Sequence, residues 1–132
     1  MTLVLSGVDL VEIERFRNLD AKIKGRFINR VFTPLEASES NQSLEHLAGK
    51  FAAKEAAAKA LGTGIGEVHW QDLEILNDPQ GSPRLFLHNA AELHARQAGW
   101  TSWSVSITHT KTLAMAMVVA LGEESNSSEN FA

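Results

Sequence analysis

The feature that most constrains the fold of this chain is a long helix-forming segment, residues 44–61, built mainly from Ala, Leu, Lys and Glu. These residue types have high intrinsic helix propensity. The segment ends at Gly62-Thr63-Gly64-Ile65-Gly66, and glycine is common just after the last turn of a helix. Small residues around Phe51 and Glu55 indicate that one face of the helix packs closely against another layer, with Glu55 at the edge of the buried surface.

Short apolar stretches before and after this segment predict β-strands. We expect the first to end near Asp9. A turn sequence, residues 77–81, separates two of the others and so predicts a hairpin. The next alternates apolar and polar side chains, and the last is apolar throughout. In chain order the stretches are residues 3–8, 72–76, 83–87, 102–108 and 114–121.

Shorter segments predict further helices. Asp9, followed three residues later by Glu12, matches a capping box and could open a helix directly after the first strand. Apolar residues then recur at helical spacing as far as Val31, with a possible break at Gly25. Another helix is predicted at Thr33-Pro34-Leu35-Glu36, which combines an N-cap, a proline at the first helical position and a glutamate that reaches back to the cap.

These elements predict an α/β fold of the α+β kind, in which a small, largely antiparallel sheet packs against one long helix and several short ones, including residues 89–98. The chain has 132 residues, 44% of them apolar, which is enough for the core of one domain. We expect that domain to span residues 1–122. Residues 123–132 are polar and rich in Ser and Asn, and we expect a disordered tail there.

Charge is distributed unevenly along the chain. The net charge of −4 argues against nucleic acid as a partner. Half of the 12 cations nevertheless fall within residues 15–30, where Asp20 is the only anion, so this segment carries +5 and the rest of the chain −9. Such a segment indicates either a docking surface for an acidic partner or a solvated helix face. Its cations are Arg15, Arg17, Lys22, Lys24, Arg26 and Arg30.

Two absences exclude whole classes of protein. There are no cysteines, which excludes a disulfide scaffold, a thiolate nucleophile and cysteine-ligated metal sites. No apolar run reaches the roughly 18 residues that a membrane span needs. We therefore expect a soluble, cytoplasmic protein without a membrane partner.

Asp9 and the Glu55 region are the first candidates for chemistry. A carboxylate at the end of an apolar strand needs a partner, and for Asp9 this is either a helix cap or a metal ion; one oxygen could serve each. Glu55 and Lys59 share a helix face, where they form either part of a site or an ordinary surface pair four residues apart. Lys50 and Lys54 can likewise be interpreted as ordinary members of surface pairs along the helix.

The second candidate region combines glycines with a cluster of donors. Gly62, Gly64 and Gly66 would let the backbone approach a ligand, although a helix C-cap is the commoner use of such a glycine. The segment is not a P-loop, since it follows a helix and lacks the Lys-Ser/Thr ending. His109 and Thr110 end the alternating strand, where a lone histidine is usually just exposed.

Taken together, these segments resemble the holo-(acyl-carrier-protein) synthase family, the small trimeric class of 4′-phosphopantetheinyl transferases. The matching stretches occur in family order and cover nearly the whole chain except the tail. The most specific is Phe51-Ala52-Ala53-Lys54-Glu55-Ala56 running into Lys59-Ala60-Leu61-Gly62-Thr63-Gly64. All of them lie in residues 7–13, 30–36, 47–66, 77–83 and 105–111.

The resemblance implies a reaction and a catalytic site. The 4′-phosphopantetheine arm of coenzyme A would move to a serine of apo acyl carrier protein, a step that serves fatty acid biosynthesis, and adenosine 3′,5′-bisphosphate would leave. The family depends on Mg²⁺, whose two carboxylate ligands correspond to Asp9 and Glu55. Lys59 corresponds to a lysine that approaches the pyrophosphate. Glu55, directly or through a metal-bound water, is our choice of general base over His109.

The resemblance also implies binding residues and partners. Coenzyme A would contact Lys50, Lys59, Gly62, Thr63, Gly64, His109 and Thr110. Many relatives have arginine at Lys50, so a bidentate phosphate contact would become a point charge here. The acidic carrier protein would dock on Arg15, Lys22 and Arg26. Family members are homotrimers with coenzyme A bound between subunits. The alternatives are a non-catalytic carrier-binding or nucleotide-binding module, and a transferase for a different carrier domain.

Overall fold

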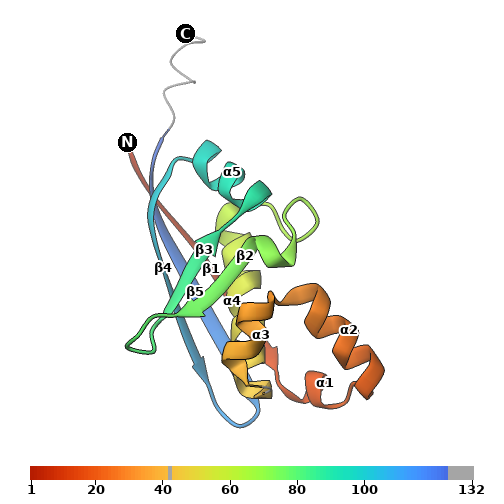
Figure 1. Cartoon of the computed structure of the whole chain (residues 1–132). Coiled ribbons are helices and arrows are strands. Elements are labelled where there is room, and N and C mark those ends of the chain that lie inside the picture. The colour runs from red at the N-terminus through yellow and green to blue at the C-terminus, as the bar shows by residue number, and fades with distance from the viewer. Residues whose placement is uncertain (42, 125–132) are drawn as a thin grey trace.

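A three-stranded antiparallel sheet with strand order β1-β5-β4 runs the length of the computed structural model, which describes residues 1–41 and 43–124 (Figure 1). A separate hairpin, β2-β3, lies beside it. The strands are β1 (Thr2–Glu12), β2 (Leu73–Asn77), β3 (Pro83–Leu87), β4 (Trp100–His109) and β5 (Leu113–Glu123). The helices are α1 (Glu14–Arg17), α2 (Ala21–Val31), α3 (Pro34–Ser40), α4 (Leu44–Leu61) and α5 (Asn89–Gln97), with a 3₁₀ turn at Trp70–Asp72. The α+β prediction is confirmed.

Helix α4 occupies the centre of the core, where it packs on β1 and β5. The alanines that face the sheet are fully buried, Ala52 and Ala56 among them. Gly7 of β1 lies directly against the backbone of α4, and a Cβ at this position would collide with the carbonyl of Ala56. Small side chains on both elements therefore allow strand and helix to approach closely, as the composition of residues 44–61 predicts.

Among residues 1–41 and 43–124, other elements cover only one face of the three-stranded sheet. Along β5, Ala114, Ala116 and Val118 face α4 and are buried, whereas the alternating residues Met115 and Met117 are exposed. The last strand is apolar throughout, as predicted, but its two faces have different surroundings. The large exposed apolar residues of β1 and β5 on the uncovered side are Val4, Val8, Leu10, Leu113, Met115, Met117 and Leu121.

The prediction of a helix opening at Asp9 is wrong. Strand β1 continues through this residue to Glu12, pairing with β5 along its whole length and placing Asp9 opposite Ala116. Helix α1 begins at Glu14 and has no side-chain cap. The ladder with β5 extends from Thr2 to Glu12, and this long-range pairing outweighs the local capping pattern at Asp9.

The predicted break at Gly25 is also wrong. Gly25 lies inside α2, and the interruption falls earlier, where Asp20 caps α2 by accepting a hydrogen bond from the Ile23 N–H at 2.9 Å. A glycine inside a helix costs about 1 kcal/mol relative to alanine. This cost is tolerated because the cap and the burial of Val31 at the other end stabilise the helix.

Helix α3 is fixed to α4 by an ion pair that is buried on both sides. The capping box at Thr33 and Glu36 forms as predicted. Glu36 also accepts from Lys54 Nζ at 2.8 Å, and neither side chain is exposed. The sequence spacing allowed Lys54 to be an ordinary surface residue that pairs along its own helix. That interpretation is wrong, because the fold brings Glu36 of another helix against Lys54 and buries both.

The ends of the predicted elements shift at the C-terminus. Strand β5 includes Glu123, whose N–H donates to the Gly99 carbonyl at 2.9 Å, so the polar tail cannot begin at this residue. The rest of the predicted tail, residues 125–132, lies outside the described residues. Within the described part of the chain, no helix has both the length and the apolar content needed to cross a bilayer.

Candidate active site

Asp9, Glu55 and Lys59 meet where β1 crosses α4. Strand alternation turns Gly7, Asp9 and Val11 towards the helix, and the Asp9 side chain is only 19% exposed. Lys59 Nζ donates to the Val8 carbonyl at 2.9 Å and lies 3.3 Å from Asp9 Oδ1. The predicted cluster therefore forms, but Lys59 makes its ion pair with Asp9 of the strand. This contact replaces the helical pair with Glu55 that its spacing allowed.

The electrostatics of Glu55 reflect this neighbourhood. Burial raises the pKa of its carboxyl above the ordinary value, and the negative charge of Asp9 raises it further, while Lys59 acts in the opposite direction. Two carboxylates held close together in a partly buried place favour a bound cation. The lysine offsets only part of their charge.

The donor set fits a magnesium ion that is completed by a substrate. Asp9 does not cap a helix. One of its carboxylate oxygens lies near Lys59, and the other has no capping role that would compete with a metal ion. The described residues contain no group of three or more His, Asp or Glu side chains arranged to hold a metal. Mg²⁺ typically takes one or two protein carboxylates together with waters and substrate phosphate oxygens. Asp9 and Glu55 match this pattern.

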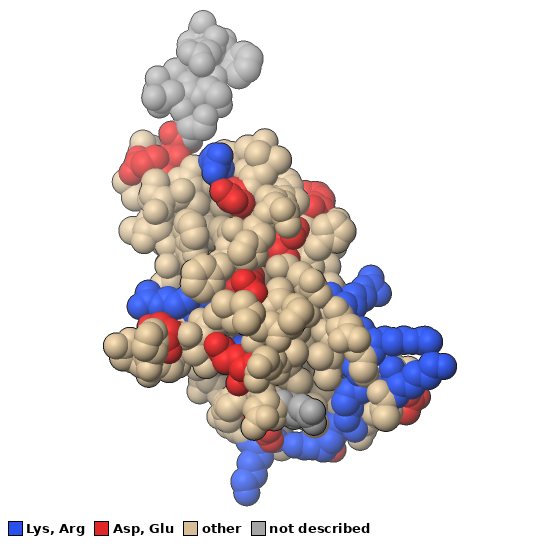
Figure 2. All heavy atoms as spheres, viewed as in Figure 1, with Lys and Arg blue, Asp and Glu red and all other residues tan. Residues whose placement is uncertain are grey.

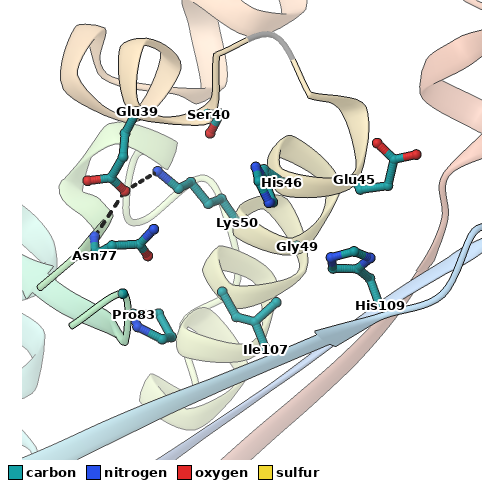
Figure 3. A pocket seen from close by; sticks show the side chains of 11 residues that line it. Glu39, Ser40, Glu45, His46, Gly49, Lys50, Asn77, Pro83, Ile107 and His109 are labelled. Atoms are coloured by element: carbon teal, nitrogen blue, oxygen red, sulfur yellow. Dashed lines mark hydrogen bonds and ion pairs between the residues drawn. The ribbon is translucent and has the colours of Figure 1, made fainter. Parts of the chain in front are cut away.

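A second feature, a pocket of about 280 Å³, lies further towards the N-terminal end of α4 (Figure 3). Lys50 and His109, both predicted to bind coenzyme A, line it together. Lys50 is only 4% exposed, and its Nζ donates to Glu39 Oε1 at 2.7 Å. The His46 ring stands edge-on to the His109 ring, with 6.1 Å between their centroids. Helices α3 and α4 thus form one wall, and β4 and the β2-β3 hairpin complete it.

The other predicted contacts with coenzyme A are not in this pocket. Gly62 closes α4 as its left-handed C-cap, twelve residues and therefore about 18 Å along the helix axis from Lys50. Thr63 follows it, and its hydroxyl is buried without a hydrogen-bond partner in the described part of the chain. Thr110 lies in the β4-β5 turn, where its Oγ1 accepts from the N–H groups of Thr112 and Leu113. The structure gives Gly62 and Thr110 clear structural roles.

The predicted docking residues lie on the basic surface of α1 and α2. Figure 2 shows Lys and Arg side chains gathered at the lower right, over these two helices. Arg15 lies at the rim of an apolar pocket of about 240 Å³ that Phe16, Phe27 and Phe51 help to line. Lys22 and Arg26 are exposed on α2. The surface therefore combines positive charge with an apolar depression.

Some residues around these features carry no recognisable sequence signal. Glu39 and His46 line the Lys50 pocket, yet neither belongs to a motif or a spacing pattern. Glu36 shows only its capping signal, although it also holds Lys54. No local pattern could have identified these roles, because each depends on a contact between separate elements.

The charged groups around α4 indicate a class of protein. Two adjacent carboxylates can hold a divalent cation, and Lys50 and Lys59 present ammonium groups along the same helix. An α+β scaffold that carries these groups has the chemistry of an enzyme acting on a phosphate-containing substrate.

Comparison with known proteins makes the assignment specific. Residues 6–118 match the model of the 4′-phosphopantetheinyl transferase superfamily. Holo-[acyl-carrier-protein] synthase from Herpetosiphon aurantiacus is 43% identical over 127 residues, covering 91% of this chain and all of that protein. The enzyme of the same name from Solidesulfovibrio magneticus is 47% identical over 118 residues, covering 88% and 96%.

Solved structures agree with this match. Helicobacter pylori holo-[acyl-carrier-protein] synthase in complex with coenzyme A superposes with a TM-score of 0.79 at 32% identity, covering 88% of this chain and 99% of that one. The synthase from Neisseria meningitidis gives a TM-score of 0.79 at 35% identity, covering 91% and 98%. The chain therefore belongs to the holo-[acyl-carrier-protein] synthase family of the 4′-phosphopantetheinyl transferase superfamily.

Proposed function

We propose that this chain transfers the 4′-phosphopantetheine arm of coenzyme A to a serine hydroxyl of apo acyl carrier protein and releases adenosine 3′,5′-bisphosphate. The observation that carries this proposal is the cluster of Asp9, Glu55 and Lys59 between β1 and α4. It lies on the scaffold of a family whose relatives bear the name holo-[acyl-carrier-protein] synthase, and one of whose solved structures is described as a complex with coenzyme A. Membership of this family does not favour a non-catalytic module.

Asp9 and Glu55 would hold the magnesium ion. When bound, Mg²⁺ supplies neutralisation of the charge on the pyrophosphate of coenzyme A. Lys59 adds a positive charge on the same side of α4, because its ammonium reaches Asp9 from one turn beyond Glu55. The Val8 carbonyl orients this ammonium by accepting a hydrogen bond from it.

Glu55 is suited to accept the proton of the attacking serine. Its carboxylate would lie beside the proposed magnesium site, where the serine must enter, and could take the proton directly or through a metal-bound water. As the serine Oγ bonds to the phosphorus of the pantetheine arm, the phosphoanhydride bond to adenosine bisphosphate breaks. The serine proton moves to Glu55, and the electron pair of the broken bond stays on the leaving phosphate, whose charge Lys59 offsets.

The pocket lined by Lys50 and His109 would take the nucleotide end of coenzyme A. It presents one buried ammonium and two imidazoles, which are suitable partners for phosphate and for a base. Gly62, Thr63 and Gly64 lie at and beyond the C-terminal end of α4, too far from Lys50 to line this pocket in the same chain. They would contact the extended pantetheine arm or a ligand held by a neighbouring subunit.

A homotrimer with sites between subunits is the assembly we propose. The uncovered face of the sheet supports it, since Val8, Leu10, Met115 and Met117 expose large apolar side chains on adjacent strands. Contiguous apolar surface of this kind marks a protein interface. The carrier protein would dock elsewhere, on Arg15, Lys22 and Arg26, where positive charge surrounds an apolar depression. A cytoplasmic location and a role in fatty acid biosynthesis remain predictions.

Release of the nucleotide product tests the proposal. Incubation with coenzyme A, Mg²⁺ and apo carrier protein should release adenosine 3′,5′-bisphosphate, measured by liquid chromatography, and the same mixture without the carrier should release none. Binding of coenzyme A without any release would identify the non-catalytic module. Release with a carrier domain of a larger synthase, but not with a free carrier protein, would identify the other acceptor class.

A further inference from the structure

We propose that Glu39 is a positioning residue that aims the Lys50 ammonium into the pocket and thereby sets the affinity for the phosphate-bearing end of coenzyme A. This inference rests on the proposed function, because it takes the pocket to be where the nucleotide end binds. No sequence pattern singles out Glu39, and its role follows from contacts between α3, α4 and β2.

The Glu39 carboxylate joins three elements at one oxygen. Its Oε1 accepts from Lys50 Nζ at 2.7 Å and from the Asn77 N–H at 2.9 Å, as the dashed lines in Figure 3 show. The next contact of Lys50 Nζ is longer, 3.4 Å to the Glu36 carbonyl. Glu39 therefore provides the shortest contact that fixes the direction of the Lys50 side chain.

A lysine at this place needs such an anchor. Its ammonium is a point charge at the end of a flexible four-carbon stem, without the planar fork that lets an arginine hold its own geometry. Lys50 is also the only Lys or Arg among the described residues that line the pocket. The direction of this one side chain decides whether the pocket presents a positive charge to a phosphate.

The neighbouring wall is consistent with a polar ligand. Ser40 follows Glu39 on α3, lines the same pocket and is 1% exposed. Its hydroxyl has no hydrogen-bond partner within the described residues. Buried polar groups normally have partners, so a ligand or water in the pocket would satisfy this hydroxyl.

Two substitutions at Glu39 separate anchoring from charge. Glu39→Ala removes the acceptor and frees the Lys50 stem. It should weaken coenzyme A binding about three- to tenfold, because a freed lysine side chain must be ordered again when the ligand binds. Glu39→Gln keeps an oxygen that can accept from Lys50 and Asn77 but removes the competing negative charge. It should bind coenzyme A at least as tightly as the wild type.

The test is the Kd for coenzyme A by isothermal titration calorimetry, with KM and kcat measured alongside. Glu39→Ala should raise Kd and KM and leave kcat unchanged. In a Lys50→Met background it should cause no further loss, because the side chain that it positions is absent. Glu92→Gln is the matched control and should leave Kd unchanged, since Glu92 also anchors a cation, Arg96 at 2.7 Å, but lies on α5 and does not line the pocket.

Two results would overturn the inference while leaving the proposed function intact. One is equal Kd values for Glu39→Ala and Glu39→Gln, and the other is a loss in Glu39→Ala that persists without Lys50. A wild-type chain that binds no coenzyme A would instead overturn the proposed function, and the inference with it. Circular dichroism spectra of each variant show whether a loss comes from unfolding.

Discussion

Gly7 of β1 packs directly on the carbonyl of Ala56 in α4, with no room for a side chain between strand and helix. This contact determines the active site, because Asp9 lies two residues further along the strand and Glu55 one residue earlier in the helix. Both carboxylates are therefore placed by a backbone contact that only glycine permits.

Replacing Gly7 with alanine should destabilise the protein by about 1–3 kcal/mol, since the added methyl group must push strand and helix apart. The free energy of unfolding from urea titration measures this loss. Gly25→Ala is the matched control. No atom of the described residues beyond the nearby backbone of its own helix lies within 4 Å of the added Cβ, and the substitution should stabilise α2 by up to about 1 kcal/mol. Equal effects of the two substitutions would contradict the packing argument.

Removing one partner of the buried pair between Glu36 and Lys54 should cost about 3–5 kcal/mol, because the other charge is left buried and unpaired. Burial lowers the pKa of Lys54, and Glu36 opposes that shift, so the pair depends on both members. Lys54→Met tests this by urea denaturation. Lys59→Met on the same helix, where the lysine side chain is 56% exposed, should change stability far less. A Lys54→Met variant as stable as Lys59→Met would contradict the conclusion that Lys54 and Glu36 form a buried ion pair that stabilises the fold.

The contribution of Glu55 to the stability of the metal-free protein should be less favourable at neutral pH than at acid pH. Its folded pKa is raised above the ordinary value of 4.5, so the folded state binds this proton more tightly than the unfolded state does. The resulting stabilisation is complete below the unfolded pKa and is lost as pH rises through the folded pKa.

Glu55→Gln should therefore stabilise the chelator-treated protein near neutral pH and leave its stability unchanged below the ordinary glutamate pKa. Urea denaturation at the two pH values provides the comparison. Glu67→Gln is the control, because the Glu67 side chain is mostly exposed, lies 3.8 Å from His94 and is not among the charges that shift the pKa of Glu55. No gain at neutral pH would mean that the site does not strain the Glu55 carboxylate.

Arg15→Glu should weaken binding of the acidic carrier protein and make the remaining binding less sensitive to salt. Arg15 stands beside the apolar pocket of α1 and α2, where a charge reversal repels a docked anion. Surface plasmon resonance at low and high ionic strength gives both quantities. The same reversal at Arg96 on α5, outside the basic segment, should have little effect. Unchanged affinity in Arg15→Glu would place the docking surface elsewhere.

Elements with strong local signals could be predicted from the sequence. Helix α4 and its Gly62 cap follow from propensity and capping alone, as do the Thr33 capping box and the β2-β3 hairpin. The continuation of β1 through Asp9 could not be predicted, because it depends on pairing with β5 more than a hundred residues later. There the tertiary ladder overrides a plausible local helix start.

The candidate site likewise contains residues that the sequence could predict and residues that it could not. Asp9, Glu55 and Lys59 carry chemistry that the sequence can flag, and the fold brings them together. The contact between Glu39 and Lys50 has no local signature, since it joins two helices and a hairpin. The burial of Lys54 is equally invisible in a spacing pattern, which looks the same for a surface lysine. Both roles depend on contacts between separate elements, which the residue types and their spacing in the sequence do not reveal.

The intact mass of apo acyl carrier protein after incubation with coenzyme A, Mg²⁺ and the enzyme tests the central claim most directly. The account predicts that the carrier gains the mass of one phosphopantetheine group with the wild-type chain. Folded Asp9→Ala and Glu55→Ala variants should produce no gain, since each lacks one of the two carboxylates at the site. No mass gain with the wild type, or full activity in either variant, would contradict it.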